Sequence, residues 1–310
     1  MEYRELGKTG IKASILSLGA SSLGGVFHSL KEKEGIKAVH TAVENGINFI
    51  DVSPYYGHLK AETVLGKALK EIDRNRYYLS TKVGRYGKDG INVWDYSPRK
   101  ATESVYESME RLHVENIDLI NVHDIEFADL DVVCNETLPA LAELREKSIV
   151  KHVGITNLTL RHFKYVIDHV AAGTVETVLS FCHYCLNDDA LVDYLDYFED
   201  RGIGVINASP FSMGLLTERG APEWHPASAP LKDVCRKATD YCKMKGKSIE
   251  QIAVKYAVSN PRIATTLFST TRSEAILQNI RWIEEPLDET LLKELRVILE
   301  PRFRDTWLNS

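Results

Sequence analysis

The chain has 310 residues, of which 44% are hydrophobic and 26% are charged, and its formal net charge at pH 7 is -6. This composition is typical of a globular protein, and the negative net charge gives no long-range field that would gather nucleic acid or an anionic membrane. No stretch approaches the roughly 18 apolar residues of a membrane span, and the first residues lack the apolar segment of a secretory signal. We therefore expect no nucleic-acid or membrane partner and a cytoplasmic location.

The five cysteines are too few for a disulfide scaffold, and their number is odd. Cys182 and Cys185 form a C-x-x-C motif, but Cys134, Cys235 and Cys242 supply no second pair with the spacing of a zinc site. If the segment is extended, residues 182 and 185 point to opposite faces. We expect reduced thiols and no metal.

Short apolar runs alternate with longer amphipathic stretches along the chain. The runs predict strands at 14–18, 47–51, 77–81, 117–122, 151–156, 176–181, 204–209 and 264–269. Apolar residues at helical spacing predict helices at 33–45, 61–71, 98–112, 131–146, 159–170, 189–201, 231–245 and 274–283. Strict alternation of eight such units predicts an α/β fold in which a parallel sheet closes into a (β/α)8 barrel. An open doubly wound sheet is the alternative fold.

Several segments exceed this plan. Residues 3–14 read as a hairpin before the first barrel strand, with Gly7 and Gly10 around its turn. Further helices are predicted at 248–260 and 288–300, and the loop at 216–230 is long and rich in proline. No shift in composition marks a boundary, so we expect one domain that spans residues 1–310.

Polar residues follow consecutive predicted strands at the end where barrels of this type place their active sites. Asp51, Lys82 and His123 follow the second, third and fourth strands, and Tyr56 lies one tight turn beyond Asp51. A phenol has a pKa of about 10, which a neighbouring ammonium lowers. Asp51 would hold Lys82 as a cation, and His123 would be a neutral hydrogen-bond donor. The set predicts proton transfer between an alcohol and a carbonyl.

Each of these residues taken singly is more often structural, and the prediction depends on four complementary groups at the ends of neighbouring strands. A metal-dependent isomerase or aldolase is a weaker reading, because the strand ends do not gather several carboxylates or histidines in a ligand pattern.

Five sequence blocks resemble, in order and across nearly the whole chain, the signature blocks of the aldo-keto reductase family. They are GINFIDVSPYYGHLKAETVLGKAL, LSTKVGRY, IDLINVHD, KHVGITN and NASPFSMGLL. The resemblance implies a (β/α)8 barrel, a nicotinamide cofactor bound without a Rossmann fold, and a catalytic tetrad of Asp51, Tyr56, Lys82 and His123. It assigns proton transfer to Tyr56 and not to Tyr55.

The same resemblance implies a set of cofactor-binding residues, with Tyr184 stacked on the nicotinamide. They are Thr156, Asn157, Tyr184, Ser209, Phe211, Gly214, Ser269, Thr270, Arg272, Gln278 and Asn279. Relatives that prefer NADP present a lysine and an arginine to its 2'-phosphate where this chain has Ser269 and Ala275. A phosphate without charged donors binds poorly. We therefore favour NAD, while Arg272 keeps NADP open.

Within the family, blocks such as VHDIEFADLD and SPFSMGLLTERGAPEWHPA resemble the branch of L-galactose dehydrogenase and other aldose 1-dehydrogenases. Such enzymes oxidise the anomeric hydroxyl of a sugar to a lactone. Residues expected to bind the sugar are Trp94, His123, Trp224 and His225, with Trp307 in the tail reaching the same mouth; loop packing is an equal reading for the tryptophans and His225.

The alternative function is a broad NADPH-dependent reductase of aldehydes and ketones. A redox-sensing regulatory subunit, as in the barrel subunits of potassium channels, is a more distant alternative from a different class. We expect a small-molecule substrate and a monomer or weak dimer.

Overall fold

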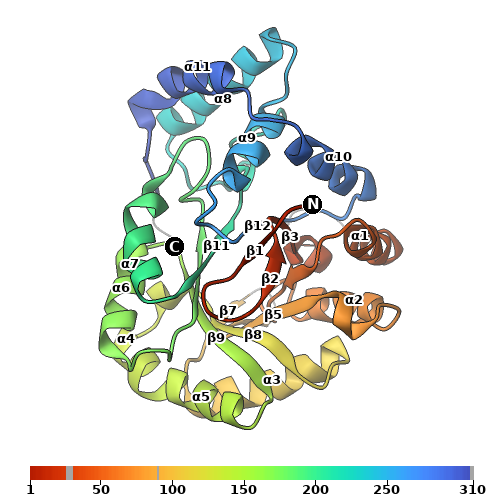
Figure 1. Cartoon of the computed structure of the whole chain (residues 1–310), viewed down its shortest axis with the longest axis vertical. Helices are drawn as coiled ribbons and strands as arrows, with labels where there is room; N and C mark the ends of the chain where they lie inside the picture. Colours follow the sequence, from red (N-terminus) through yellow and green to blue (C-terminus); the bar gives the residue numbers. More distant parts are fainter. Residues whose placement is uncertain (26–30, 89–90, 308–310) are drawn as a thin grey trace.

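The computed structural model of the chain describes residues 1–25, 31–88 and 91–307. Its centre is a closed barrel of eight parallel strands, in which the last strand pairs with the first (Figure 1). The strands are β3 (Leu16–Gly19), β4 (Phe49–Asp51), β5 (Tyr78–Val83), β8 (Ile117–Val122), β9 (Val150–Asn157), β10 (Thr177–Phe181), β11 (Gly204–Ala208) and β12 (Thr265–Phe268). All eight overlap predicted strands, so the barrel is confirmed and the open sheet is wrong.

Helices surround the barrel, as the alternation of sequence patterns predicts (Figure 1). They are α1 (Glu32–Glu44), α2 (Lys60–Leu69), α3 (Pro98–Leu112), α5 (Leu138–Glu146), α6 (Leu160–His169), α7 (Leu195–Asp200), α8 (Ala229–Met244), α9 (Ile249–Val258), α10 (Ser273–Glu284) and α11 (Glu289–Leu299). Local chemistry sets where they begin. Ser97 caps α3 by accepting a hydrogen bond from the Lys100 N–H at 3.3 Å, and Pro98 occupies its first turn.

Two predicted helices are not continuous. The segment predicted at 131–146 consists of α4 (Leu130–Val132), a π-helical stretch η4 (Val133–Thr137) and α5. Pro139 lies in the first turn of α5 and has no N–H to donate to the preceding turn, which favours the change in helix type. The segment predicted at 189–201 is a 3-10 stretch η5 (Ala190–Tyr194) followed by α7.

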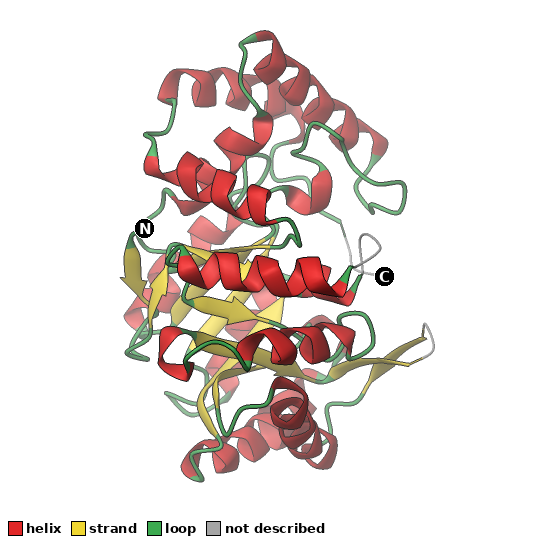
Figure 2. Ribbon diagram, turned by 90° about the vertical axis from the view of Figure 1, so that its right-hand side faces the viewer, coloured by secondary structure: helices red, strands yellow, loops and turns green. Residues whose placement is uncertain are grey.

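Two hairpins stand outside the barrel. The first, β1 (Tyr3–Glu5) and β2 (Lys12–Ser14), confirms the prediction, with Gly7 and Gly10 at positive φ in the turn. The second, β6 (Arg85–Lys88) and β7 (Ile91–Trp94), follows the third barrel strand and was not predicted. Figure 2 shows the second hairpin projecting on the side where the C-terminus lies, away from the N-terminus.

The N-terminal hairpin closes one end of the barrel. Its Leu6, Ile11 and Ala13 pack in one buried cluster with barrel residues such as Phe49 and Leu119. The polar side chains predicted to form the site lie at the opposite end, where the strands finish.

Short 3-10 turns complete the fold: η1 (Ser21–Gly24), η2 (Arg74–Arg76), η3 (Ile125–Phe127), η6 (Ser212–Gly214) and η7 (Glu300–Arg302). Among the described residues, every helix is too short or too polar to cross a bilayer.

Candidate active site

The predicted tetrad comes together at the C-terminal end of the barrel. Asp51 ends β4, Lys82 lies in β5, His123 follows β8 and Tyr56 lies in the turn after β4. Asp51, Lys82 and His123 are buried, with 3%, 1% and 4% of their surface exposed. Neighbouring parallel strands place these side chains side by side, which is the arrangement expected from their positions in the sequence.

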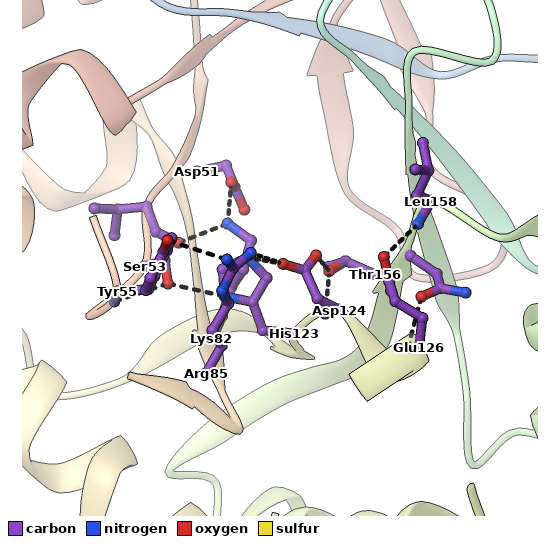
Figure 3. Close-up of polar contacts among 12 residues, drawn as sticks. Asp51, Ser53, Tyr55, Lys82, Arg85, His123, Asp124, Glu126, Thr156 and Leu158 are labelled. Carbon is purple, nitrogen blue, oxygen red and sulfur yellow. Dashed lines mark hydrogen bonds and ion pairs between the residues drawn. The ribbon is translucent and has the colours of Figure 1, made fainter. Parts of the chain in front are cut away.

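Asp51 and Lys82 form a buried ion pair (Figure 3). The Lys82 ammonium donates to Oδ1 of Asp51 and to the Val52 carbonyl, the latter at 2.8 Å. The Ser80 hydroxyl donates to the other carboxylate oxygen at 2.7 Å. Burial alone would lower the pKa of Lys82, but the Asp51 carboxylate and the Tyr56 phenol outweigh it and the pKa is raised. Lys82 is therefore a cation at neutral pH.

Tyr56 lies above this ammonium, with Lys82 Nζ 4.9 Å from the centre of the ring. Burial raises the pKa of Tyr56 above its ordinary 10.0, and Lys82 offsets only part of the effect. Lys82 lowers the pKa of Tyr56, as predicted, but the net pKa is raised because the loss of solvation is larger than the attraction of the ammonium. Tyr56 is a protonated phenol at neutral pH.

Two glycines allow the turn that carries Tyr56 to lie close to η1. Gly57 has a φ of +61°, and a Cβ at this position would come within 2.1 Å of the Gly24 carbonyl oxygen. A Cβ on Gly24 would in turn meet the Tyr56 carbonyl oxygen at 2.7 Å. Only glycine permits this close approach between η1 and the turn.

His123 faces the Tyr56 ring edge to face, with ring centres 5.8 Å apart and planes at 89°. Its Nδ1 lies 3.1 Å from the Ser53 hydroxyl and its Nε2 lies 3.5 Å from Oδ2 of Asp124. Burial, then the charges of Lys82 and Arg85, hold the pKa of His123 well below its ordinary value. The ring is neutral, as the sequence predicts.

A second ion pair, between the partly buried Arg85 and the buried Asp124, lies beside His123 and was not singled out in the sequence (Figure 3). The Arg85 guanidinium donates to Oδ2 of Asp124 at 2.5 Å and to the Tyr55 hydroxyl at 3.0 Å. Burial raises the pKa of Asp124, while Arg85 opposes the shift. Tyr55 therefore belongs to the Arg85 pair and Tyr56 to the Lys82 pair, which separates the roles of the two phenols.

The signals for this pair were modest: an arginine three residues after Lys82 and an aspartate directly after His123. Neither spacing identifies a site by itself, and the hairpin of β6 and β7, which begins at Arg85, was not predicted.

Aromatic side chains surround Arg85. The guanidinium carbon lies 3.8 Å from the centre of the Tyr55 ring and 4.6 Å from that of Trp94. Trp94 stacks on Phe127 of η3 at 4.1 Å. Of the tryptophans predicted to bind substrate, Trp94 is thus linked to His123 through Arg85 and Asp124.

The other predicted substrate residues lie in the loop after η6. Trp224 is 54% exposed, whereas His225 is 3% exposed and both of its ring nitrogens contact backbone, at the Ser212 carbonyl and the Ala227 N–H. Trp307 packs edge to face on His225 at 4.9 Å. His225 and Trp307 hold the loop and the tail together. Their contacts are therefore those of loop packing, the alternative to sugar binding.

Thr156 and Asn157 hold the backbone that follows β8. The Thr156 hydroxyl accepts from the Asp124 N–H at 3.0 Å, and the side-chain Oδ1 of Asn157 accepts from the Glu126 N–H at 2.9 Å. The Asn157 amide also donates to the Thr159 carbonyl. These two residues thus position Asp124 in its left-handed conformation, with a φ of +47°.

Tyr184 is buried, and one face of its ring is covered by Tyr256 at 4.9 Å. It follows β10 in a turn that also holds Cys182, whose φ is +63°. This C-x-x-C segment is therefore not extended. All five cysteines are free and buried, and the described residues contain no cluster of metal-binding side chains.

The remaining predicted cofactor residues lie after β11 and β12. Ser209 has a φ of +62°, and Phe211 and Gly214 follow it around η6. Ser269 accepts from the Ser22 N–H at 3.0 Å, which ties the end of β12 to η1. Thr270 and Arg272 lead into α10, where Gln278 accepts from Arg281.

These segments fit a cofactor with polar groups. Oδ1 of Asn279 and Oγ of Ser180 are buried and have no hydrogen-bond partner among the described residues. Buried polar atoms without partners are uncommon in folded proteins. Both atoms are suited to pair with a dinucleotide, Asn279 as an acceptor on α10 and Ser180 in the barrel strand β10.

The sequence is similar to a known protein family and to individual proteins within it. The sequence model described as the aldo/keto reductase family matches residues 15–300. The chain is 43% identical over 313 residues to an L-galactose dehydrogenase of Arabidopsis thaliana, covering 99% of this chain and 97% of that protein. It is 32% identical over 229 residues to a D-arabinose 1-dehydrogenase of Saccharomyces cerevisiae, covering 70% of this chain and 67% of that protein.

Solved structures support the fold. An aldo-keto reductase of Bacillus halodurans, in its holo form, superposes with a TM-score of 0.82 at 23% identity, covering 100% of this chain and 99% of the other.

Proposed function

The chain belongs to the aldo/keto reductase family, and on this premise we propose that it oxidises the anomeric hydroxyl of an aldose such as L-galactose to the lactone. The family consists of oxidoreductases that use NAD(H) or NADP(H). The observation that carries the proposal is the 43% identity, along 99% of the chain, with a protein named L-galactose dehydrogenase. The D-arabinose 1-dehydrogenase among the relatives supports an aldose as the substrate class.

Tyr56 is the proposed general base for this oxidation. The sugar hydroxyl would lie between Tyr56 and His123, whose rings meet edge to face at 5.8 Å. The proton of the hydroxyl passes to the phenolate oxygen of Tyr56. Lys82 stabilises that phenolate through its charge, and Asp51 holds Lys82 in place and charged.

His123 is the proposed hydrogen-bond donor that orients the reacting oxygen. A neutral imidazole donates a hydrogen bond without adding a positive charge that would oppose the loss of hydride from the neighbouring carbon. The C–H and O–H bonds of the anomeric centre break and a C=O bond forms. A bound nicotinamide would supply the acceptor for the hydride that leaves carbon, and Ser180 and Asn279 are residues that would help to hold the cofactor.

The sugar ring is proposed to lie against Trp94, Tyr55 and the Arg85–Asp124 pair. Stacked aromatic faces suit the C–H faces of a pyranose, and a charged pair offers both donors and an acceptor to ring hydroxyls. Trp224, which is exposed in the loop after η6, remains a prediction for the outer wall of the same mouth.

NAD is the proposed cofactor. Ser269, at the position of the lysine in NADP-preferring relatives, is committed to Ser22, and Ala275 in the first turn of α10 carries no charge. Arg272 is exposed at the start of α10 and is the residue that would favour NADP instead.

The proposal includes a cytoplasmic location, a single domain over residues 1–310, and a monomer or weak dimer. Free, buried cysteines support a reducing compartment.

The deciding experiment is the initial rate of NADH or NADPH formation over a panel of aldoses that includes L-galactose, L-fucose, D-arabinose and their enantiomers. NAD-linked oxidation of one configuration is the expected result. Silence on every sugar, together with NADPH-linked reduction of simple aldehydes, would instead identify a general carbonyl reductase. A clearly lower KM for NADP than for NAD would overturn the cofactor assignment.

A further inference from the structure

Ser53 contacts both His123 and Tyr56, the two residues proposed to act on the substrate oxygen: His123 through its hydroxyl and Tyr56 through its backbone carbonyl. Ser53 is fully buried, at 0% exposure, in the turn between Asp51 and Tyr56. Its Oγ has two partners among the described residues: the Tyr55 N–H, which donates to it at 3.1 Å, and Nδ1 of His123, also at 3.1 Å (Figure 3). The backbone carbonyl of Ser53 accepts from the Tyr56 N–H at 3.1 Å.

The two contacts of Oγ differ in direction. A backbone N–H can only donate, so the contact with Tyr55 uses the oxygen as an acceptor. The hydroxyl proton then requires an acceptor, because a buried polar hydrogen without a partner is costly. Among the described residues, the acceptor within reach of that proton is Nδ1 of His123.

A neutral imidazole has one acceptor nitrogen and one donor nitrogen. If Nδ1 accepts from Ser53, the single ring proton is on Nε2. Nε2 lies 3.5 Å from Oδ2 of Asp124, a carboxylate that favours an N–H over a lone pair on its neighbour. Both contacts of the ring therefore favour the same tautomer.

We infer that Ser53 is a positioning residue that fixes His123 as the Nε2–H tautomer, so that His123 donates to the substrate oxygen and proton acceptance is left to Tyr56. In the other tautomer, Nε2 would present a lone pair to the sugar hydroxyl and would compete with Tyr56 for its proton. One serine thus holds both members of the pair, through its side chain for His123 and its carbonyl for Tyr56.

This inference rests on the proposed function for its catalytic consequence, but its test does not. The experiment is 15N NMR of full-length protein labelled at histidine, in which protonated and unprotonated ring nitrogens resonate far apart. The His123→Gln variant identifies the His123 signals among those of the ten histidines by their loss. The expected wild-type spectrum has a protonated Nε2 and an unprotonated Nδ1 whose resonance shows an accepted hydrogen bond. A protonated Nδ1 would overturn the inference.

The Ser53→Ala variant removes the donor. We expect its Nδ1 resonance to move towards that of a nitrogen that accepts no hydrogen bond, and kcat to fall about tenfold with a smaller change in KM, the size expected for one hydrogen bond. Ser53→Thr, which keeps a hydroxyl, restores both. An unchanged Nδ1 resonance in Ser53→Ala would overturn the inference even if the variant were less active.

Ser17→Ala is the matched control. Ser17 is also buried at 0% exposure and its hydroxyl donates to the Ser14 carbonyl at 3.1 Å and accepts from Thr265 at 2.6 Å, at the closed end of the barrel. We expect lower stability and unchanged His123 signals. If Ser53→Ala does not fold, the wild-type spectrum alone decides the tautomer. If no aldose is oxidised, the proposed function fails while the NMR result still decides which nitrogen carries the proton.

Discussion

The ammonium of Lys82 lies under the ring of Tyr56, 4.9 Å from its centre, while the same ammonium is held from behind by the Asp51 carboxylate and the Val52 carbonyl. A charge in this position acts on the phenol without needing to move. It reduces the cost of forming a phenolate in a buried site, where that cost is high. Lys82 therefore affects the pH at which Tyr56 can act as a base, and the charge on Lys82 depends on Asp51.

Replacing Tyr56 with phenylalanine should abolish turnover and leave cofactor binding nearly intact. The phenol acts in the chemical step, and loss of a general base costs about 10²- to 10⁴-fold in rate. The measurements are kcat with an aldose and the affinity for NAD by fluorescence titration. A variant that keeps a tenth or more of wild-type turnover would reject the role of Tyr56.

Tyr55→Phe is the matched control for this prediction, because Tyr55 is the adjacent phenol and bonds to Arg85 instead. We expect its kcat to stay within a few-fold of wild type, since one hydrogen bond is worth about 1 kcal/mol. A larger loss in Tyr55→Phe than in Tyr56→Phe would exchange the two assignments.

The oxidation should accelerate as pH rises, whereas the reverse reduction should not. Oxidation needs the phenolate of Tyr56, and the groups that face this phenol are Lys82, Asp51 and Asp124. Burial dominates them and raises the pKa above 10.0, so the phenolate fraction grows about tenfold per pH unit throughout the neutral range. Reduction uses the protonated phenol, which is present over that whole range.

The measurement is kcat/KM against pH in both directions, which reports the free enzyme. Lys82→Met should move the alkaline limb of the oxidation to higher pH, because the charge that favours the phenolate is removed. A flat oxidation profile from pH 6 to 9 would contradict a base with a raised pKa.

Much of the barrel and the tetrad could be predicted because each depends on local patterns. Apolar runs separated by amphipathic stretches identify strands that are buried on both faces, and Asp51, Lys82 and His123 stand where those runs end. Their proximity then follows because β4, β5 and β8 are neighbours in the parallel sheet. Tyr56 follows from its short distance to Asp51 along the chain.

The Arg85–Asp124 pair and the pKa of Tyr56 were beyond prediction for different reasons. Arg85 begins the hairpin of β6 and β7 and contacts Asp124. Each strand of this hairpin has four residues, too few for a strand-like alternation to be recognised in the sequence. The pKa of Tyr56 depends on how completely the phenol loses water, which is a property of packing and not of spacing. The sequence identified the sign of the Lys82 contribution but not its size relative to burial.

Gly57→Ala should destabilise the protein and impair catalysis together. A methyl group at Gly57 meets the Gly24 carbonyl oxygen at 2.1 Å and must also adopt a φ of +61°. We expect a loss of about 2 kcal/mol or more in the free energy of unfolding, and a fall in kcat because the Tyr56 turn has to shift. Urea unfolding and steady-state kinetics measure the two effects.

Gly173→Ala separates strain from crowding. Gly173 has a φ of +81°, but a Cβ there has no atom within 4 Å. We expect a loss of about 1 kcal/mol from backbone strain alone and an unchanged kcat. Equal losses of stability and activity in the two variants would show that the contact between Gly57 and Gly24 does not position Tyr56.

Asp51→Asn should destabilise the fold more than a surface substitution, and a second substitution should recover part of the loss. The amide keeps the shape of the side chain but leaves the Lys82 ammonium, at 1% exposure, without its anion. Breaking a buried pair in this way costs about 3–5 kcal/mol in the free energy of unfolding.

In Asp51→Asn with Lys82→Met, no charge is left to desolvate, so the double variant should be more stable than Asp51→Asn alone. It should also stay inactive, because the phenolate of Tyr56 has lost its cation. Urea unfolding of the four proteins in this cycle gives the coupling energy, and additive losses would mean that the Asp51–Lys82 contact contributes nothing to stability.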